Sequence, residues 1–522
     1  MLDDQKRNPS DVRTVAEGKK LSGMAAIKAA SEHAEKVEPI SADTLPNQRK
    51  PARAQSNGPG AVSHSVHSKC DEERADPPEQ MAVRRPRVEV TEDGIAQELV
   101  RRHDGRIKFD HSRNVWFIWD KCVWQKDVTG RIRQILREIT REATKRWSHD
   151  EARKVRRATF ISGAERMAKT DRRVSVTADH WDSDKMLLGC PGATVNLTTG
   201  EIRKPDPSNA ITKLCGVAPG KGSCPTWLQF LQDVTDGDED VIAFIQLWVG
   251  YLLTGRTDEQ VLLFIHGPGG NGKSVFLNVI SRILGEYSAT AAMDTFTKSR
   301  NDRHPTDLAM LCGARSVSVS ETEDGRNWAE ARVKQLTGGD EITARFMRQD
   351  YFSFLPSFKL TIVGNHQPML SNVDPAMKRR FLVLPFEHHP KTKDPDLEMK
   401  LWAEAPQILE WAIRGCLEWQ QRDLPRPATI MDATEHYFEE QDTFSQWMEE
   451  RCELVPSGGF TSAADLYHSW RRHAEDLGEE PSTSKTLGQK SKRNGLSSRQ
   501  KRILGRNCKV WFGISMRTPE LK

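Results

Sequence analysis

The sequence has 522 residues, enough for about two to four domains, and 77 Lys and Arg against 73 Asp and Glu leave a formal charge of only +4. This overall charge alone does not argue for a partner such as nucleic acid, so any evidence for one must come from the local distribution of charge. The nine cysteines include no CxxC pair, and no His pair completes a zinc pattern, which argues against a structural metal site.

The ends and the apolar runs of the chain bear on its compartment. The first ten residues, MLDDQKRNPS, have no apolar core of the kind found in signal peptides. The longest apolar runs, such as residues 261–265, are far shorter than a membrane span. An odd number of cysteines without a pairing pattern suits a reducing compartment. We therefore expect a soluble, cytoplasmic protein that does not contact membranes.

Residues 1–88 contain no Phe, Trp or Tyr and are rich in Pro, Ser, Ala, Lys and Glu. Such a segment buries too little apolar surface to offset the entropy lost on ordering the chain. We predict a disordered tail, with at most a frayed helix around residues 24–36.

Aromatic residues begin at Phe109. Residues 106–126 place three Trp on strand-like segments, and residues 132–147 repeat apolar side chains at helical spacing. Residues 187–202 are typical of short strands around a turn. These patterns predict a small α+β domain over residues 89–225, whose sequence indicates no chemistry.

The central part of the chain has the pattern of an α/β domain, which we expect over residues 226–390. Residues 226–254 are typical of two leading helices separated by a turn at 235–238, and a buried strand follows at 261–265. Buried strands and helices then alternate around a central sheet. Helical patterns return at residues 397–422 and 438–452, within a helical region expected over residues 391–455.

A glycine-rich loop follows the strand at 261–265 and matches the GxxxxGK[ST] pattern of a P-loop. Its residues are Gly267, Pro268, Gly269, Gly270, Asn271, Gly272, Lys273 and Ser274. The glycines let backbone N–H groups turn inward around phosphate oxygens, and the next helix points the positive end of its dipole at them. Lys273 would contact the β and γ phosphates, and the Ser274 hydroxyl would ligate Mg²⁺. The loop therefore predicts ATP and Mg²⁺ as cofactors.

An alternating run of β-branched residues at 315–320 ends at Glu321, and Glu323 follows closely. An acid at the carboxyl end of a strand beside a P-loop can hold the Mg²⁺ shell or orient the attacking water. A run of acids is also common in solvated turns, and that alternative stays open. Glu321 is our candidate for catalysis and for metal ligation, with Glu323 as the second choice.

A second strand, residues 359–363, leads to Asn365. Its amide could bond the γ-phosphate or the attacking water, although an Asn that caps a turn is the commoner use. Thirteen residues after Asn365, the sequence Lys378-Arg379-Arg380 begins and precedes a strand at 381–385. These arginines are either solvated charges or arginine fingers that reach the nucleotide of a neighbouring subunit.

The order of these motifs resembles superfamily 3 helicases and, more narrowly, the phage and plasmid primase–helicase family, with relatives in poxviruses and other large DNA viruses. The resemblance is specific over residues 187–390 and includes the runs KQLTGGDEITARFMRQD and MKRRF. It implies an α/β fold with an AAA+-like P-loop ATPase core.

The family motifs carry over residue by residue as expectations. Lys273 and Ser274 match the Walker A motif and Glu321 matches Walker B. Residues 334–340 open a further motif, Asn365 matches the polar sensor, and Arg379 or Arg380 matches the arginine finger. Many relatives carry two adjacent acids at Walker B, where this chain has Ser320 before its glutamate. That difference leaves open how metal ligation and water activation are divided.

Residues 341–354 are typical of two strands around a tight turn at 346–349. In the family, the equivalent hairpin projects into the channel of a ring. The resemblance therefore implies DNA contacts from Arg345, Phe346, Met347 and Arg348, since charge beside an aromatic ring suits single-strand binding. A surface hairpin with solvated arginines is the alternative.

The carboxyl-terminal segment is strongly basic. Residues 482–511 hold nine Lys or Arg and no Asp or Glu. An amphipathic helix, a basic helix at 484–494 and a hairpin at 502–514 are typical of a winged-helix module, which we predict over residues 456–522. Its groove contacts would come from Lys490, Lys492 and Arg493. A loosely ordered basic tail is the alternative.

These patterns together predict an ATP-dependent DNA helicase. The resemblance implies a homo-oligomeric ring, expected as a hexamer, that translocates on single-stranded DNA with 3′-to-5′ polarity during phage, prophage or plasmid replication. A P-loop kinase or regulatory switch, and a DNA-binding protein without turnover, are the alternatives. Because the segment before the P-loop shows no convincing acid cluster, we predict no primer synthesis.

Overall fold

The computed structural model describes residues 88–298, 306–320, 327–348, 350–370, 374–389, 393–455, 459–477, 481–503 and 506–517. All of them fall within one compact unit, residues 85–522. The predicted disordered tail and the helix expected at residues 24–36 lie outside the described residues, apart from Val88.

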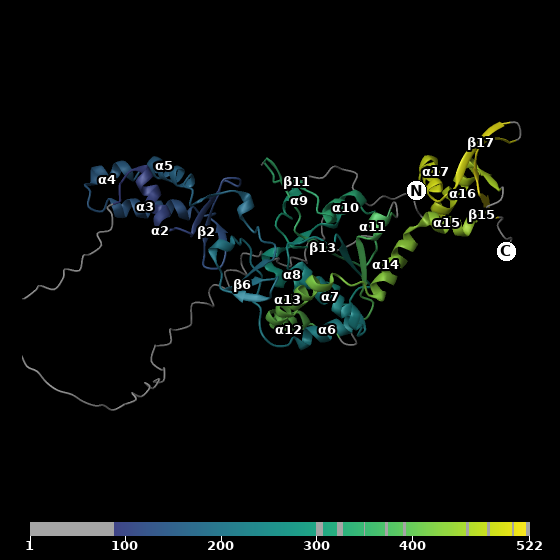
Figure 1. The fold of residues 1–522 in the computed structure, drawn as a ribbon, viewed down its shortest axis with the longest axis horizontal. Helices are drawn as coiled ribbons and strands as arrows, with labels where there is room; N and C mark the ends of the chain where they lie inside the picture. The colour runs from purple at the N-terminus through teal and green to yellow at the C-terminus, as the bar shows by residue number, and fades with distance from the viewer. Residues whose placement is uncertain are drawn as a thin grey trace, which may run out of the picture. The chain divides into compact units, whose positions relative to one another are not determined.

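The amino-terminal part mixes helices with a small sheet, as the sequence predicts (Figure 1). The sheet has the order β3-β2-β1-β4, and β1 pairs antiparallel with β2 but parallel with β4. Its elements are α2 (Glu92–Arg102), β1 (Ile107–Asp110), β2 (Val115–Trp119), β3 (Trp124–Lys126), α3 (Arg131–Ala143), α4 (His149–Val155), α5 (Ala158–Lys169) and β4 (Ser175–Val176). The helix predicted to reach residue 147 ends earlier. The hydroxyl of Thr144, the C-cap of α3, donates back to the Thr140 carbonyl, and a turn follows.

A second antiparallel sheet contains β5 (Leu187–Cys190), β6 (Ala193–Asn196) and β7 (Glu201–Arg203). Its buried side chains, Leu188 and Val195, belong to the same apolar cluster as the helices that follow. The Tyr287 hydroxyl accepts from the Gly189 N–H at 3.0 Å, and buried Arg315 donates to the Leu187 carbonyl at 2.6 Å. This sheet is therefore fastened to the central region.

The central sheet has five parallel strands in the order β14-β8-β13-β10-β9. They are β8 (Leu262–His266), β9 (Ser288–Ala291), β10 (Ser316–Ser320), β13 (Lys359–Gly364) and β14 (Phe381–Pro385). Successive side chains point to opposite faces, so Leu263 and Ile265 join one apolar cluster while Leu262 and Phe264 join the other. Burial on both faces explains the continuous apolar runs in the sequence.

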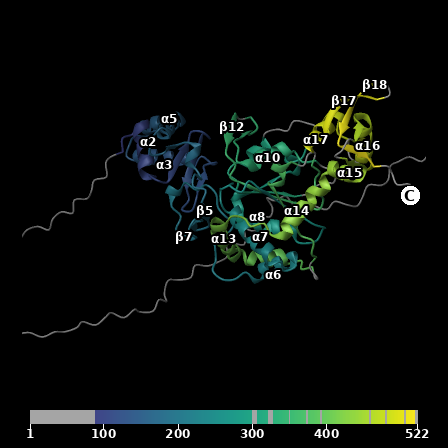
Figure 2. The same ribbon diagram turned by 45° about the vertical axis from the view of Figure 1, so that its right-hand side comes forward.

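Helices cover both faces of this sheet, with α7 and α13 on one side and α10 on the other (Figures 1 and 2). The helices of the first face are α6 (Pro225–Thr235), α7 (Glu239–Leu252), α8 (Lys273–Leu284), α12 (Leu397–Ala403) and α13 (Ala405–Arg422). The other side contains α10 (Glu330–Gly338) and α14 (Ala428–Gln441), with the short helices α9 (Thr306–Ala309) and α11 (Pro375–Lys378) nearby in the chain. The two leading helices predicted from the sequence are confirmed as α6 and α7.

The helix predicted at residues 397–422 is wrong in one respect, because it breaks at Glu404 into α12 and α13. The Glu404 carboxylate accepts hydrogen bonds of 3.0 Å from the backbone N–H groups of Thr226 and Trp227. These groups open α6, whose N-cap residue Cys224 supplies no side-chain bond. The break thus places an acid at the positive end of a distant helix.

The helix predicted at residues 438–452 is also divided. It ends as α14 at Gln441, and α15 (Thr443–Arg451) begins after Asp442, whose side chain caps it by accepting from the Ser445 N–H. Cys452 then starts β15 (Cys452–Leu454), which pairs with β19 (Ile514–Met516).

The carboxyl-terminal elements form a small cluster of helices and strands. Its further elements are β16 (Phe460–Ser462), α16 (Ala463–Asp476), α17 (Ser484–Arg493), β17 (Ser497–Ile503) and β18 (Arg506–Phe512). Trp447, Trp470, Leu487 and Trp511 build its core, and the sheet order is β16-β18-β17. The hairpin predicted at 502–514 therefore starts five residues earlier, at Ser497. Among the described residues, no helix is long and apolar enough to cross a bilayer.

Candidate nucleotide-binding site

The P-loop, residues 267–274, leaves the carboxyl end of β8, a strand that lies between β13 and β14. In the register of the sheet His266 stands beside Gly364 and Pro385, so three strands end together at this edge. Ligands of open parallel sheets bind outside the carboxyl ends of the strands. The helix α8 begins at Lys273, directly after the loop, so its positive end faces the same edge.

Two glycines of the loop, Gly267 and Gly272, occupy positions that a larger residue could not. Gly272 has a φ of +86°, and a Cβ added there would lie 2.8 Å from a ring carbon of Phe230 and 2.9 Å from a methyl of Val234. A Cβ on Gly267 would overlap the Phe386 carbonyl. Gly269 has open space instead, with no heavy atom within 4 Å of an added Cβ.

This contrast supports a matched prediction. We expect Gly272→Ala to lower ATP affinity at least about tenfold and to cost about 1–3 kcal/mol of stability, because it combines backbone strain with a clash against α6. Gly269→Ala should leave both quantities close to wild type. Nucleotide titration by fluorescence and thermal denaturation measure the two effects. Equal losses in both variants would contradict the steric explanation.

Lys273 is 5% exposed, and its ammonium group donates three hydrogen bonds within the loop. The acceptors are the carbonyl oxygens of Gly267 at 2.6 Å and Pro268 at 2.7 Å, and Asn271 Oδ1 at 2.8 Å. Burial lowers the pKa of Lys273 from its ordinary value. Ser274 lies exposed in the first turn of α8, one residue further along.

Asn271 has a role that the sequence did not indicate. Its side chain is 1% exposed, accepts from Lys273 and donates to the carbonyl oxygen of Phe386. The N–H of Phe386 in turn donates to the His266 carbonyl, and an imidazole nitrogen of His389 lies 3.1 Å from the Gly269 carbonyl oxygen. The segment after β14 therefore lines the P-loop, a contact that no local motif encodes.

The strands β10 and β13 lead to the predicted acid and the predicted amide in the sequence. β10 ends at Ser320, which stands beside Val363 in the register, and Asn365 follows Gly364 as an exposed residue. Burial lowers the pKa of the neighbouring His266, and a hydrogen bond to the Asn365 backbone acts in the opposite direction. Glu321 and Glu323 lie outside the described residues.

Arg379 and Arg380 stand at the other edge of the sheet, just before β14. The Arg380 carbonyl accepts from the N–H of Leu262, the first residue of β8. Arg379 is exposed. Arg380 is buried and donates to the Ala376 carbonyl at 2.8 Å. The sequence treats the two arginines alike, whereas the structure gives them different surroundings.

The short helix α11 that leads to these arginines is anchored at its start. Asp374 caps it by accepting from the Met377 N–H at 2.8 Å, and the same carboxylate pairs with Lys334 of α10. Lys334 opens the run of residues 334–340 that the family resemblance singled out. The contact therefore ties that run to the segment carrying the arginines.

The predicted hairpin is present as β11 (Ile342–Arg345) and β12 (Tyr351–Phe354). Arg345 stands opposite Tyr351, with its guanidinium 4.7 Å from the ring centroid. Phe346 and Met347 are 39% and 69% exposed at the turn, and Arg348 has a φ of +62°. The hairpin thus ends in exposed apolar and basic side chains.

The residues predicted on the basic helix differ in exposure. Lys492 is exposed, whereas Lys490 is half-buried with its ammonium 5.9 Å from the Phe444 ring centroid. The side chain of Arg493 lies outside the described ones. Lys485 is a further exposed base on α17.

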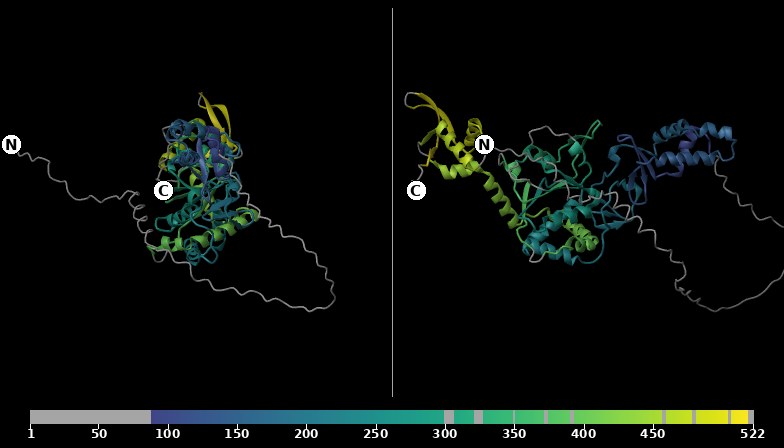
Figure 3. Two further views of the ribbon diagram at one scale, coloured as in Figure 1. Left: turned by 90° about the vertical axis from the view of Figure 1, so that its left-hand side faces the viewer. Right: turned by 180° about the vertical axis from the view of Figure 1, so that it is seen from behind.

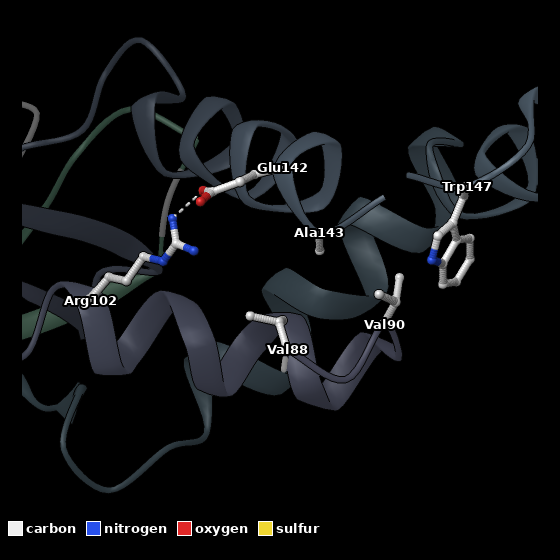
Figure 4. Close-up of a pocket in the computed structure, with 6 residues that line it drawn as sticks. All are labelled: Val88, Val90, Arg102, Glu142, Ala143 and Trp147. Atoms are coloured by element: carbon white, nitrogen blue, oxygen red, sulfur yellow. Dashed lines mark hydrogen bonds and ion pairs between the residues drawn. The ribbon is translucent and has the colours of Figure 1, made fainter. Parts of the chain in front are cut away.

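A pocket of about 340 Å³ lies apart from all these residues, beside α2 and α3 (Figure 4). Arg102 and Glu142 form an ion pair of 2.6 Å on one side of it, and the Trp147 indole stands at the other end beside Val90. None of the predicted site residues lines this pocket.

Two family models match the chain. Residues 96–236 match one described as "D5 N terminal like", and residues 265–380 match a family of unknown function, DUF5906. The second match starts just before the P-loop and ends at Arg380, so it covers the ends of β8, β10 and β13 and both arginines.

Curated viral proteins share parts of the sequence. A protein named "Putative helicase" in Frog virus 3 (isolate Goorha) is 27% identical over 281 residues, which are 49% of this chain and 28% of the relative. Another with that name in Acanthamoeba polyphaga mimivirus is 23% identical and covers 56% of this chain and 33% of the relative. A "Putative primase" of African swine fever virus is 21% identical, with 60% and 36% covered. The chain thus spans about a third of the length of these relatives.

Among solved structures, the apo form of the NrS-1 C-terminal region matches with a TM-score of 0.47 and 12% identity, covering 81% of this chain and 99% of that one. The "A form" of the same region has a TM-score of 0.46 and 10% identity, with 81% and 99% covered. The D5-type family match and the helicase and primase names of the relatives show that the chain fits the phage and viral primase–helicase family.

Proposed function

We propose that this chain is an ATP-dependent DNA helicase of phage, prophage or plasmid replication. The observation that carries the proposal is the common edge of the central sheet. The P-loop follows β8, Asn365 follows β13, and β10 ends at Ser320 directly before Glu321. An anion-binding loop, an acid and an amide on adjacent strands are the groups that ATP hydrolysis requires.

The residues at this edge divide the chemistry between them. Lys273 and the loop N–H groups would bind the phosphates, and Ser274 and Glu321 would hold Mg²⁺, since oxygen ligands suit this hard cation. The bound metal supplies positive charge that neutralises the phosphates during transfer. Glu321 accepts a proton from the attacking water, and Asn365 orients that water by a hydrogen bond.

The position of Arg379 supports a ring. Five residues of β8 separate the P-loop from the point where Arg380 pairs with Leu262, a length of about 16 Å along the sheet. An arginine side chain cannot span that distance to its own P-loop. Arg379 therefore acts on the nucleotide of an adjacent subunit, which requires a head-to-tail homo-oligomer, proposed as a hexamer.

The β11–β12 hairpin is the proposed contact with single-stranded DNA. Arg345 and Arg348 would contact phosphates, and Phe346 with Met347 offers apolar surface for bases. Stacking and charge without base-specific hydrogen bonds suit a protein that moves along any sequence. The helix α17 and its neighbouring hairpin form a proposed winged-helix module for duplex DNA.

A substitution at the acid tests the proposal. Wild-type protein should hydrolyse ATP faster when single-stranded DNA is added, and Glu321→Gln should remove turnover, by about 10²–10⁴-fold, while ATP still binds. Strand displacement on forks with 3′ or 5′ tails then reports unwinding and its polarity. If the protein stays monomeric with ATP and DNA, and DNA does not change its ATPase rate, the helicase function is excluded and a kinase or regulatory switch is favoured. If the wild-type protein binds DNA but does not hydrolyse ATP, it is a DNA-binding protein without enzymatic activity.

A further inference from the structure

The hairpin of β17 and β18, here called the wing, concentrates positive charge within the proposed winged-helix module. Its described residues include five Lys or Arg and no Asp or Glu. All five are exposed: Arg499, Lys501, Arg502, Arg506 and Lys509. In Figure 3 the wing, in yellow, projects away from the helices of its own module.

The register of the wing places basic groups on both of its faces. Directly opposed residues of an antiparallel pair share a face, and neighbours along a strand alternate. Lys501 stands opposite Cys508, Arg499 opposite Val510 and Ile503 opposite Arg506, so one face carries Arg499, Lys501 and Arg506.

The other face carries Arg502, opposite Asn507, and Lys509, opposite Gln500. Positive charge on two sides of a thin ribbon suits a ligand with negative charge on both sides. A single strand, or the flat face of an acidic protein, would meet only one face at a time.

Duplex DNA offers that geometry in its grooves, where two phosphate backbones flank the space. The major groove is about 12 Å wide and admits a two-stranded β-ribbon. Strands of seven residues extend about 20 Å, enough to cross it. Gln500 and Asn507 are exposed on the second face, and their amides are groups that hydrogen-bond to base edges.

Two of the wing's lysines lie beside aromatic rings. The Lys501 ammonium lies 3.5 Å from the Phe460 ring centroid, and that of Lys509 lies 5.5 Å from the Trp511 ring centroid. Trp511 belongs to the module's core, so the ribbon packs onto that core at its base. By contrast, α17 has the exposed lysines Lys485 and Lys492, while the half-buried Lys490 lies over the Phe444 ring.

We propose that the wing inserts into a groove of duplex DNA between the two phosphate backbones, and that it, more than α17, carries the duplex affinity of this chain. The proposal deepens the DNA-binding part of the proposed function. It does not depend on ATP hydrolysis, so the two can fail separately.

Face-selective variants of the full chain test the insertion. One carries Arg499→Gln, Lys501→Gln and Arg506→Gln; the other carries Arg502→Gln and Lys509→Gln. The measured quantity is the affinity for a labelled mixed-sequence duplex, without ATP, at several salt concentrations. The slope of log affinity against log salt should shrink by about three in the first variant and about two in the second. At moderate salt each should bind the duplex on the order of 10²-fold more weakly.

Matched controls separate the wing from charge in general. Arg137→Gln, Arg141→Gln and Lys145→Gln remove three exposed charges from α3 and the turn after it, and should leave the slope unchanged. Lys485→Gln with Lys492→Gln tests the helix α17. Single-stranded DNA of the same sequence, and DNA-stimulated ATPase, are measured on every variant.

Four outcomes would overturn the proposal. If only one face matters, the ribbon lies flat on one backbone. If single-strand binding falls as far as duplex binding, the wing is not a groove reader. A larger loss in the α17 variant would assign the duplex to the helix. Unchanged duplex binding in both wing variants would show that the wing does not bind DNA, and an acidic protein would then be the better candidate for its partner. Loss of ATPase stimulation with intact duplex binding would affect only the helicase proposal.

Discussion

Lys273→Ala is expected to lower the kcat of ATP hydrolysis by about 10²–10³-fold. The ammonium group sits within the loop on three acceptors, and the bound phosphates would take over those bonds. Removing a preorganised charge from the point where negative charge develops typically costs about 10²–10³ in rate, and ATP binding also loses its cationic contact. A coupled assay of phosphate release measures the change.

The control for this prediction is another buried lysine, which lies in the central sheet and not in the P-loop. Lys359 is 3% exposed, donates to the Thr254 carbonyl and lies 4.8 Å from the Tyr251 ring centroid. It begins β13, at the edge opposite the P-loop. Lys359→Met should lower thermal stability yet retain ATPase in the folded fraction. If both variants lose activity in proportion to their loss of stability, Lys273 has only a structural role.

The local parts of the proposed site could be predicted from the sequence, because each is written in consecutive residues. The P-loop pattern, the buried runs at 261–265 and 359–363 and the turn between β11 and β12 depend on neighbours a few positions apart. Their place at one edge follows from a general rule, since parallel strands end together. The register of β8 with β13 and β14 agrees with that expectation.

Long-range contacts account for what could not be predicted. The edge strand β9 is a short run, Ser-Ala-Thr-Ala, without an apolar pattern, and its pairing with β10 defines it. The helix break at Glu404 makes sense only once α6, about 180 residues earlier, lies beside it. Asn271 meets Phe386 in the same way, from a distant part of the chain. Such contacts have no signature in either segment alone.

Burial likewise separates residues that look equivalent in the sequence. Arg379 and Arg380 are identical neighbours, yet only the first is exposed and the second bonds to Ala376. The Nε of Arg380 is buried without a hydrogen-bond partner among the described residues, and burial lowers its pKa from the ordinary value. A side chain that must reach another subunit needs to be free to extend. We therefore propose Arg379, and not Arg380, as the arginine finger.

Arg379→Ala is expected to lower ATPase activity by about 10³–10⁵-fold, since an arginine finger supplied to a neighbouring nucleotide contributes that much in other NTPases. ATP binding should change little, because the P-loop at the opposite edge of the sheet is untouched. The decisive measurement mixes this variant with Lys273→Ala in equal amounts. Each variant is inactive alone. In a random mixture, the intact P-loop of an Arg379→Ala subunit meets the intact arginine of a Lys273→Ala subunit at about a quarter of the interfaces.

Mixing should therefore restore a substantial share of the activity, which an arginine acting within its own chain could not do. No subunit in the mixture has both Lys273 and Arg379. A site made from a single chain would therefore stay defective in every mixture. Arg380→Ala serves as the control and should mainly lower thermal stability, because its guanidinium holds the end of α11. Rescue by Arg380→Ala in place of Arg379→Ala would reverse the assignment. No rescue with either variant would contradict a site shared between subunits, and with it the ring.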